Sequence, residues 1–459
     1  MFFEQYYLGC LSHASYLIGD GTSGRAVVID PQRDVSQYLD DAAAHNLKIE
    51  RVIETHFHAD FLSGHLELAD ATGAVISYGE AAEGASFPIE RMAHGERLAL
   101  GDVVLEIRAT PGHTPESISI VVYEHADDVV PYGVCTGDTL FIGDVGRPDL
   151  LASKGVTAEE LARALYRSTR EQLLTLPDAT RVFPAHGAGS ACGKQLSTET
   201  VSTIGEQRRT NYALADMSED DFVRVVTEGQ PVAPQYFAFD AQRNREDRAL
   251  LDETEAPKPL SFDEVIALQH QGAVVLDTRE ASEYAFGHLQ GAIEVGLGGR
   301  FSEYAGDIVR ADQDIVIVAE PGTELESKVR LARIGFDRVV GALADPVRAF
   351  LDHPDAIEQS SRLSARELRS RMRDGDVQLV DVRNPGELEH GTITGARNIP
   401  LAQLTQRLGE LDANRPTVVF CAGGYRSAIA ASTLSSAGFA DVSDVLGGFD
   451  AWRNLEHAP

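Results

Sequence analysis

Hydrophobic residues in the first half of the chain fall into short runs, and most of these runs end at a polar turn. Residues 12–30 contain two β-rich runs around Asp20-Gly21, which predicts a hairpin. The elements expected after it are a helix near 35–45, a strand at 51–53, a helix at 64–71 and a strand at 73–77. Because strands alternate with helices, the pattern predicts a layered α/β or αββα body.

The hydrophobic pattern of the second half repeats itself. The run Val274-Val275-Leu276-Asp277-Thr278-Arg279 recurs as Leu379-Val380-Asp381-Val382-Arg383 at an offset of about 104 residues. Gly291-Ala292 and Gly395-Ala396 keep the same offset. This predicts two copies of one small parallel-sheet α/β domain, at 260–355 and 361–459.

A connection between domains is expected between residues 228 and 260, where proline and charged residues replace the regular pattern. The first domain is therefore predicted at 1–250, with a linker helix or segment at its end. At 459 residues, three domains agree with a usual size of about 150 residues each.

The composition is that of a soluble protein. Hydrophobic residues make up 43% and charged residues 24%, and no apolar run has the length of a membrane span. Residues 1–8 lack the features of a signal peptide and predict a first strand, so a cytoplasmic location is expected.

The charge and the cysteines exclude several classes of partner and framework. A formal net charge of −31 argues against nucleic acid or an anionic membrane as a partner, since both require a basic face. The four cysteines form no CxxC pair, which argues against a disulfide framework and a structural zinc knuckle.

Side chains of metal-ligand type follow four of the predicted strands. They are His56, His58 and Asp60 after the first of these strands, then His113, Asp138 and His186 after later ones. Taken singly, each residue is equally well explained as a turn residue, a cap or a buried polar group. Because all of them stand at strand-to-loop junctions, where sites are usually built, together they predict a metal site.

Residues 1 to about 250 resemble the metallo-β-lactamase superfamily. Its pattern HxHxDH, followed by His, Asp and His at later strand ends, matches these six residues, but Phe61 stands in place of the third histidine. In hydrolase members that histidine helps to hold a second metal, so the resemblance implies a single ion here. His56, His113 and Asp138 would hold it.

Two imidazole nitrogens and one carboxylate suit a non-haem Fe(II) ion with open coordination positions. The segments 56–60 and 136–149 look like those of the persulfide dioxygenase branch, in which a thiol persulfide and O2 give sulfite and the free thiol. One Fe(II) is therefore the expected cofactor, with zinc as the alternative in the isolated protein because the same ligands bind both.

The same resemblance implies roles for the remaining polar residues. His58, Asp60 and His186 would orient ligands or bound water without holding the metal themselves. Arg147 is a candidate anchor for carboxylates of the substrate, since a guanidinium pairs well with them. A surface salt bridge is an equally good explanation for Arg147.

Cys421 is the candidate nucleophile of the second copy. The strand 417–420 ends at Cys421-Ala422-Gly423-Gly424-Tyr425-Arg426 and leads into a helix near Ser427. A thiol in a glycine-rich loop at a helix N-terminus faces backbone N–H groups, which favours the thiolate, and the same loop can hold a persulfide or an oxyanion. Arg426 adds positive charge. The first copy has Val318 or Ala319 at the equivalent place and therefore no nucleophile.

The two copies resemble rhodanese sulfurtransferase domains, and CAGGYR matches the family's loop CxxGxR. The resemblance implies that Cys421 forms the persulfide and that Arg426 belongs to its site. The expected fold is thus an N-terminal αββα metallo-β-lactamase-like sandwich followed by two α/β rhodanese-like domains, the first without a catalytic cysteine.

The function predicted from these resemblances is a persulfide dioxygenase–sulfurtransferase fusion. Its expected partners are a small thiol persulfide, O2, and sulfite or thiosulfate, with sulfur passing through Cys421 in either direction, and a homo-oligomer is expected. Two alternatives stay open at this stage. One is a mononuclear zinc hydrolase of a glutathione thioester, and the other is a non-enzymatic persulfide carrier or sensor.

Overall fold

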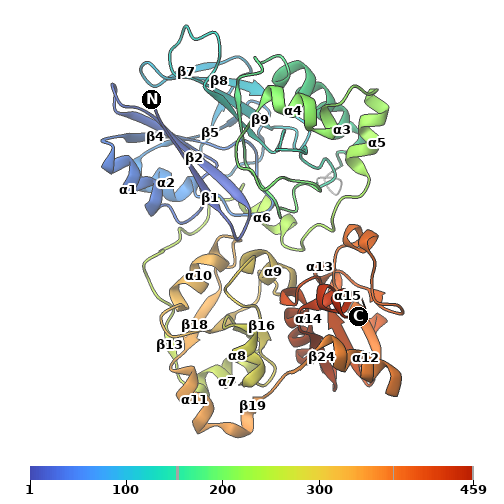
Figure 1. Ribbon diagram of the computed structural model, residues 1–459. Coiled ribbons are helices and arrows are strands. Elements are labelled where there is room, and N and C mark those ends of the chain that lie inside the picture. The colour runs from blue at the N-terminus through green and yellow to red at the C-terminus, as the bar shows by residue number, and fades with distance from the viewer. Residues whose placement is uncertain (151–154, 376, 457–459) are drawn as a thin grey trace. The chain divides into compact units, whose positions relative to one another are not determined.

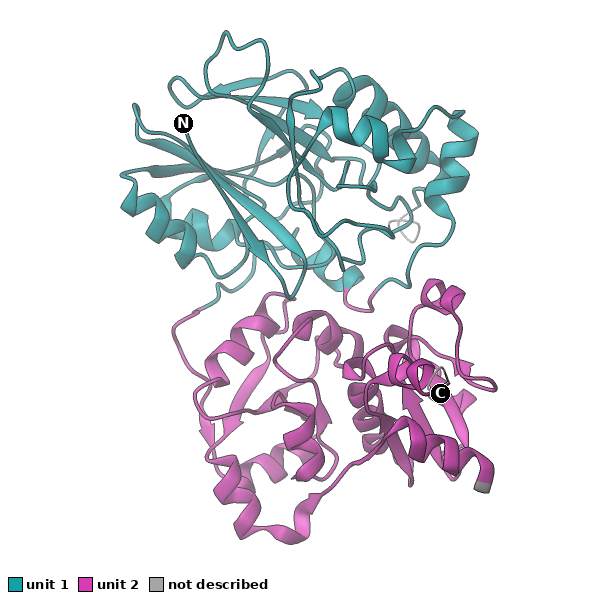
Figure 2. Ribbon diagram, in the orientation of Figure 1, with its two compact units in different colours: residues 1–233, 237–251 teal, residues 234–236, 252–459 magenta. Residues whose placement is uncertain are grey.

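The computed structural model describes residues 1–150, 155–375 and 377–456 (Figure 1). The chain divides into two units, residues 1–233 with 237–251 and residues 234–236 with 252–459 (Figure 2). Within the described ranges, no helix combines the length and the apolar composition that a membrane crossing requires.

Two six-stranded sheets form the centre of the first unit. The first sheet contains, in spatial order, β1 (Phe2–Leu8), β2 (His13–Asp20), β3 (Arg25–Ile29), β4 (Lys48–Ile53), β5 (Val75–Gly79) and β6 (Glu90–Met92). The second contains β12 (Ser202–Thr203), β11 (Arg181–Pro184), β10 (Gly133–Gly137), β9 (Ile118–Tyr123), β8 (Val104–Ala109) and β7 (Arg97–Ala99).

Helices cover the outer faces of both sheets. The helices of this unit are α1 (Ser36–Ala44), α2 (His65–Thr72), α3 (Ala158–Arg167), α4 (Ile204–Thr210), α5 (Glu219–Thr227) and α6 (Phe237–Arg243). Tyr38 of α1 and Leu68 of α2 belong to one buried cluster with residues of the first sheet. Leu165 of α3 and Phe222 of α5 belong to another with residues of the second sheet. The layers are therefore αββα.

Inner strands of this sandwich, such as β2, are buried on both faces because each face meets a different layer. In β2, Tyr16 and Ile18 lie in the cluster between the sheets, whereas Leu17 lies in the cluster under the helices. Successive side chains of a strand point to opposite faces, so a nearly continuous apolar run fills both cores. The predicted hairpin is present, with Leu17 paired to Val28.

The second unit contains two sheets with the same strand order. The first copy has β13 (Pro259–Leu260), β18 (Val339–Leu343), β17 (Ile315–Val318), β14 (Val274–Asp277) and β16 (Ile293–Glu294). The second copy has β20 (Ser361–Leu363), β24 (Val442–Val445), β23 (Thr417–Phe420), β21 (Gln378–Asp381) and β22 (Arg397–Asn398). Neighbouring strands in both sheets are parallel, as the repeat predicted.

Helices flank both parallel sheets. In the first copy they are α7 (Phe262–His270), α8 (Ala281–Phe286), α9 (Phe301–Ile308), α10 (Glu324–Ala332) and α11 (Pro346–Asp352). In the second they are α12 (Ala365–Asp374), α13 (Leu401–Leu404), α14 (Tyr425–Ser436) and α15 (Gly448–Glu456). A short antiparallel pair, β15 (His288–Leu289) with β19 (Ile357–Glu358), lies outside the sheets. The predicted fold class is confirmed.

The region between residues 228 and 260 is more structured than its composition indicates. It contains α6, and residues 237–251 belong to the first unit. Arg248 is held by Glu67 of α2, with Nη1–Oε1 and Nη2–Oε2 distances of 2.6 and 3.0 Å. Polar residues in this segment therefore pair with distant parts of the chain, which composition does not reveal. The predicted domain boundaries stay predictions.

Candidate metal centre and cysteine loop

The predicted metal-ligand residues leave the ends of four strands. His56, His58 and Asp60 follow β4 of the first sheet, while His113, Asp138 and His186 follow β8, β10 and β11 of the second. All six side chains are buried. Two glycines keep the chain close to the site: a Cβ on Gly137 would lie 2.6 Å from Thr55 Oγ1, and one on Gly146 would lie 1.9 Å from Asp138 O.

His56, His113 and Asp138 come together in one buried cluster. One ligand atom from each lies within 4.8 Å of the other two. Nε2 of His113 is 3.5 Å from Oδ2 of Asp138. Nε2 of His56 and both carboxylate oxygens of Asp138 have no hydrogen-bond partner among the described residues. Burial and the neighbouring histidines hold the pKa of His56 well below its ordinary value, so its ring is neutral.

Hydrogen bonds orient the rings from behind. His113 Nδ1–H donates to the main-chain oxygen of Arg147 at 2.9 Å. His56 Nδ1 lies 3.0 Å from Thr55 Oγ1, and that hydroxyl donates to Asp30 Oδ2 at 2.9 Å. Because the Thr55 hydroxyl donates its hydrogen bond to the Asp30 carboxylate, the hydroxyl oxygen accepts a hydrogen bond from His56 Nδ1–H. Nε2 of His56 therefore carries no proton and faces the cluster. The sequence patterns did not single out Thr55 and Asp30. Their only local signal is the position of Thr55 directly before His56.

His58 lies against two carboxylates that do not belong to this cluster. Its Nε2 lies 3.1 Å from Asp30 Oδ1 and 3.4 Å from Glu54 Oε2. Burial opposes the charged ring, but these two carboxylates raise the pKa of His58 well above its ordinary value. These are charge contacts to Nε2, whereas Nδ1 has no hydrogen-bond partner among the described residues. Nδ1 is therefore the ring nitrogen that could offer a lone pair to a cation.

His186 and Asp60 lie beside the cluster. Nε2 of His186 is 3.2 Å from Asp60 Oδ2 and 3.4 Å from Asp138 Oδ1, and its Nδ1–H donates to Ser12 O at 3.2 Å. With His58, these two residues form a second group whose ligand atoms lie within 4.8 Å of one another. The supporting roles predicted for His58, Asp60 and His186 stay predictions.

Phe61 and His13 fill the space next to this second group. The Phe61 ring centroid is 4.4 Å from that of His58 and 4.0 Å from that of His13. His13 is the first residue of β2, and its main chain pairs with that of His186 in an isolated antiparallel β-bridge. Neither ring nitrogen of His13 has a hydrogen-bond partner among the described residues, and burial lowers its pKa well below the ordinary value. From the sequence, His13 was expected only as part of a strand.

The donor set fits a divalent cation. Buried polar atoms without partners cost free energy, about 1–3 kcal/mol each in proteins. Nε2 of His56 and the oxygens of Asp138 are such atoms, and they converge with His113 on one place. A cation bound there would remove this cost. Two nitrogens and one carboxylate leave further positions open, which is typical of a catalytic ion and not of a closed structural one.

Arg147 contributes to the centre through its main chain. Its guanidinium pairs with Asp149 through two contacts of 2.7 Å and donates to Ala191 O at 3.1 Å, and the side chain is buried. The ion pair named as an alternative for Arg147 is therefore present, although it is not on the surface. Substrate binding by Arg147 stays a prediction.

Cys421 lies at the end of β23, at the start of the loop that leads into α14. The main-chain N–H of Gly424 donates to its sulfur at 3.1 Å, and Ser427 Oγ lies 3.7 Å from it. Gly424 has a φ of 111°, which favours glycine. Behind the loop, Gly448 packs so closely that a Cβ there would lie 2.4 Å from Cys421 O. One main-chain N–H of the loop therefore faces the sulfur. The role of Cys421 stays a prediction.

The charge of Arg426 is balanced by a carboxylate. Its Nη1 and Nη2 each lie 2.7 Å from an oxygen of Glu387 in a two-contact pair. The sequence predicted that Arg426 adds positive charge near the thiol, and its partner Glu387 offsets that charge.

The first copy supplies contacts to the cysteine loop and no thiol. Asp277 pairs with Val318 in one sheet as Asp381 pairs with Phe420 in the other, so Ala319 is the counterpart of Cys421. The Tyr425 hydroxyl lies 2.6 Å from Gly296 O and 2.8 Å from Gly298 O of the first copy. The first copy, which lacks the cysteine, thus accepts hydrogen bonds from Tyr425, the first residue of α14.

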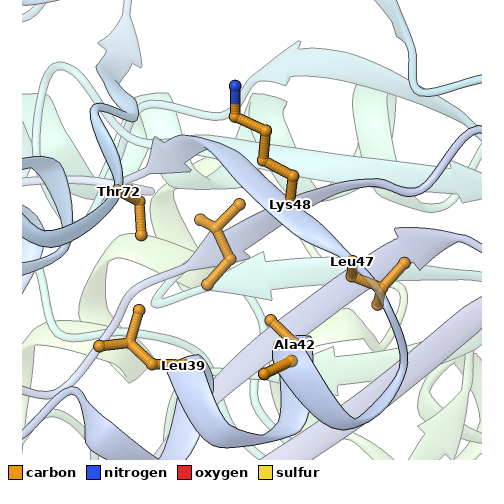
Figure 3. A pocket seen from close by; sticks show the side chains of 7 residues that line it. Leu39, Ala42, Leu47, Lys48 and Thr72 are labelled. Carbon is orange, nitrogen blue, oxygen red and sulfur yellow. The ribbon is translucent and has the colours of Figure 1, made fainter.

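A separate surface pocket of the first unit has no carboxylate, imidazole or thiol among its described lining residues. It lies over α1 and β4, and Leu39, Leu47 and Ile49 supply much of its wall (Figure 3). Lys48 and Thr72 are the polar residues among its described lining residues. A metal site needs carboxylates, imidazoles or thiols, so this pocket is not a candidate metal site.

The αββα sandwich and the buried cluster of histidines and carboxylates define a class of metal-dependent proteins. The chain matches the Metallo-beta-lactamase superfamily over residues 8–186 and the Rhodanese-like domain over 261–351 and 364–455. The mitochondrial persulfide dioxygenase ETHE1 of Bos taurus is 32% identical over 234 residues, which are 50% of this chain and 82% of that protein. For the Homo sapiens protein the identity is 31% over 237 residues, with the same shares.

A solved structure of a metallo-beta-lactamase from Staphylococcus aureus subsp. aureus COL covers a larger part of the chain. It is 33% identical, has a TM-score of 0.67 and covers 74% of this chain and 98% of its own. The chain therefore belongs to the metallo-beta-lactamase superfamily and carries two rhodanese-like domains in its C-terminal half. Its N-terminal unit is homologous to persulfide dioxygenases.

Proposed function

We propose that the first unit oxidises a small thiol persulfide with O2 and that Cys421 carries sulfane sulfur to or from the product. The observation that carries the proposal is the buried set of His56, His113 and Asp138, whose ligand atoms converge. His56 Nε2 and the Asp138 carboxylate oxygens have no hydrogen-bond partner among the described residues. The name of the ETHE1 relatives supports the choice of reaction.

The reaction balances with one water. A thiol persulfide, O2 and water give the free thiol and sulfite, and the outer sulfur loses four electrons to O2. Bound Fe(II) would supply the open positions and the redox chemistry for this oxidation. The chain's own residues keep the ligands oriented: Arg147 O holds His113, and Thr55 with Asp30 holds His56. Burial keeps bulk water from the cluster.

The sulfur-transfer step takes place at Cys421. A Cys421 persulfide and sulfite would give the Cys421 thiol and thiosulfate, and the reverse reaction is equally balanced. The Gly424 N–H that donates to the sulfur would stabilise the thiolate as the leaving group. We propose that both activities reside in one chain, so that the sulfite formed in one unit is the acceptor in the other.

Oxygen uptake with glutathione persulfide, coenzyme A persulfide and hydrogen polysulfide tests the proposal, with iron and zinc measured on the same anaerobically purified sample. Asp138→Ala is expected to lower uptake below about one hundredth of the wild-type rate, because it removes a ligand. Cys421→Ser is expected to retain uptake and to lose thiosulfate formation. Zinc-loaded protein that hydrolyses a glutathione thioester and consumes no O2 would contradict the proposal and support the hydrolase.

A further inference from the structure

Asn244 connects the segment expected to be a linker with the loop that carries the metal-ligand residues. Its Nδ2 donates to His58 O and Phe61 O, both at 2.8 Å, and its Oδ1 accepts from Ser63 N at 2.9 Å. Asn244 has an exposed fraction of 0%. Main-chain oxygens only accept and the Ser63 N–H only donates, so these partners determine the orientation of the amide.

A second residue of the same segment holds the next element. Arg248 pairs with Glu67 of α2, the helix that begins at the end of the loop, and also donates to Ser63 O. Burial opposes the Glu67 charge, but Arg248 and Arg33 lower the pKa of this carboxyl below its ordinary value. We call residues 244–248 the strap. The strap therefore donates hydrogen bonds to the loop at 54–62 through Asn244 and pairs with Glu67 of α2 through Arg248.

The loop has no regular secondary structure of its own. Residues 54–62 lie between β4 and α2 and belong to neither a helix nor a strand. Its main chain must nevertheless present His56 to the cluster within a few tenths of an ångström, because ligand distances to a metal are narrow. The main-chain N–H groups of Thr55 and Phe57, on either side of His56, donate to Asp30 and Glu116. Three hydrogen bonds from the buried Asn244 amide hold the rest of the loop at His58, Phe61 and Ser63.

We propose that Asn244 is a positioning residue of the metal centre, and that docking of the strap and binding of the metal stabilise each other. The inference rests on the proposed metal site at His56, His113 and Asp138. Because coupling between two binding equilibria is reciprocal, loosening the strap must weaken metal binding, and removing the metal must loosen the strap.

Asn244→Asp in the full-length chain tests the first half of this coupling. The substitution keeps the shape of the side chain, removes both N–H donors and places a carboxylate against two carbonyl oxygens. The affinity for Fe(II), measured anaerobically by competition with a chelator of known affinity, is expected to fall about 10–100-fold. An unchanged affinity would overturn the inference.

Asn398→Asp is the matched control. Asn398 Nδ2 donates to Asp381 O at 2.9 Å and Arg383 O at 2.8 Å, which is the same chemistry in the second rhodanese-like domain. This variant is expected to bind Fe(II) as the wild type does. Equal losses of affinity in both variants would show a general loss of folding and overturn a specific role for Asn244. Asn244→Ala, which adds no charge, is expected to lose affinity in the same range.

Hydrogen exchange in the wild-type chain tests the second half and does not depend on a variant that folds. Peptides covering 58–63 and 244–248 are expected to exchange about 10-fold more slowly with Fe(II) than without it, while a peptide covering 397–401 is unchanged. Equal exchange of the strap in both forms would overturn the inference. If the wild type binds neither iron nor zinc, the proposed function fails as well, whereas a bound metal with unchanged strap exchange overturns only this inference.

Discussion

The number of metal ions that the centre holds depends on side chains beside the ligands. The sequence pointed to Phe61, which replaces a histidine of the superfamily pattern. The structure adds His58, whose Nε2 lies between the carboxylates of Asp30 and Glu54 and is therefore already engaged. We expect Phe61 and the carboxylates that face His58 Nε2 to act together against a second ion.

Restoring a histidine at position 61 separates these two effects. Phe61→His is expected to leave the metal content near one ion per chain, because His58 still faces Asp30 and Glu54. The loss of Phe61 packing against His13 is expected to cost about 1–3 kcal/mol of the free energy of unfolding. Metal analysis by mass spectrometry and urea unfolding check both numbers. A content near two ions would show that Phe61 alone excludes the second metal.

At the scale of elements, β16 of the first rhodanese-like copy meets α14 of the second at Glu294, whose carboxyl is buried. Glu294 N–H donates to Ser432 Oγ at 3.0 Å, and Glu294 Oε1 accepts from Gly296 N–H at 2.7 Å. Burial raises the pKa of Glu294 to about 8, and the Asp277 carboxylate adds to the rise. Arg362, Asp444 and Tyr425 are the other charged or titratable groups near this carboxyl.

This raised pKa makes the stability of the second unit depend on pH. Folded Glu294 keeps a proton that the unfolded chain releases near pH 4.3, so the stabilisation is complete below that pH and is lost as pH rises to about 8. Glu294→Gln keeps a neutral side chain at every pH. Its free energy of unfolding is expected to match the wild type near pH 4. The excess over the wild type is expected to grow by up to about 1.4 kcal/mol per pH unit until pH reaches about 8, and to stay constant above that. Denaturant titrations at several pH values measure the difference, and a pH-independent difference would contradict the assignment.

At the scale of the whole molecule, the two units have separate buried cores. The clusters of the first unit contain residues up to Val226, and those of the second begin at Leu260. Two units with separate cores are expected to unfold in two calorimetric transitions. A ligand that binds only one folded unit stabilises only that unit.

Metal removal should therefore act on one transition alone. Chelation is expected to lower the midpoint temperature of the first unit's transition by about 5–10 °C, since a tightly bound ion adds a few kcal/mol to the stability of that unit. The transition of the second unit should stay in place, and Cys421→Ser serves as a control that alters neither metal binding nor the first transition. Differential scanning calorimetry with and without chelator checks this. Equal shifts of both transitions would contradict independent unfolding.

The sequence by itself determined the class of the fold and the candidate chemistry. Strand periodicity, the repeat in the second half and the placement of His56, His113, Asp138 and Cys421 at strand ends are local signals, so they are visible without coordinates. The fold class and the family that these patterns predicted are confirmed by the αββα and parallel sheets and by the relatives.

Only the tertiary structure decided how the candidate residues are supported. Asp30, Asn244 and Glu387 act on His56, His58 and Arg426 across long stretches of sequence, and no local periodicity marks such pairs. The sheet register also made Ala319, and not Val318, the counterpart of Cys421. The physical reason is that a hydrogen bond depends on distance in space, and the packing of sheets and helices sets that distance between residues that the sequence keeps far apart.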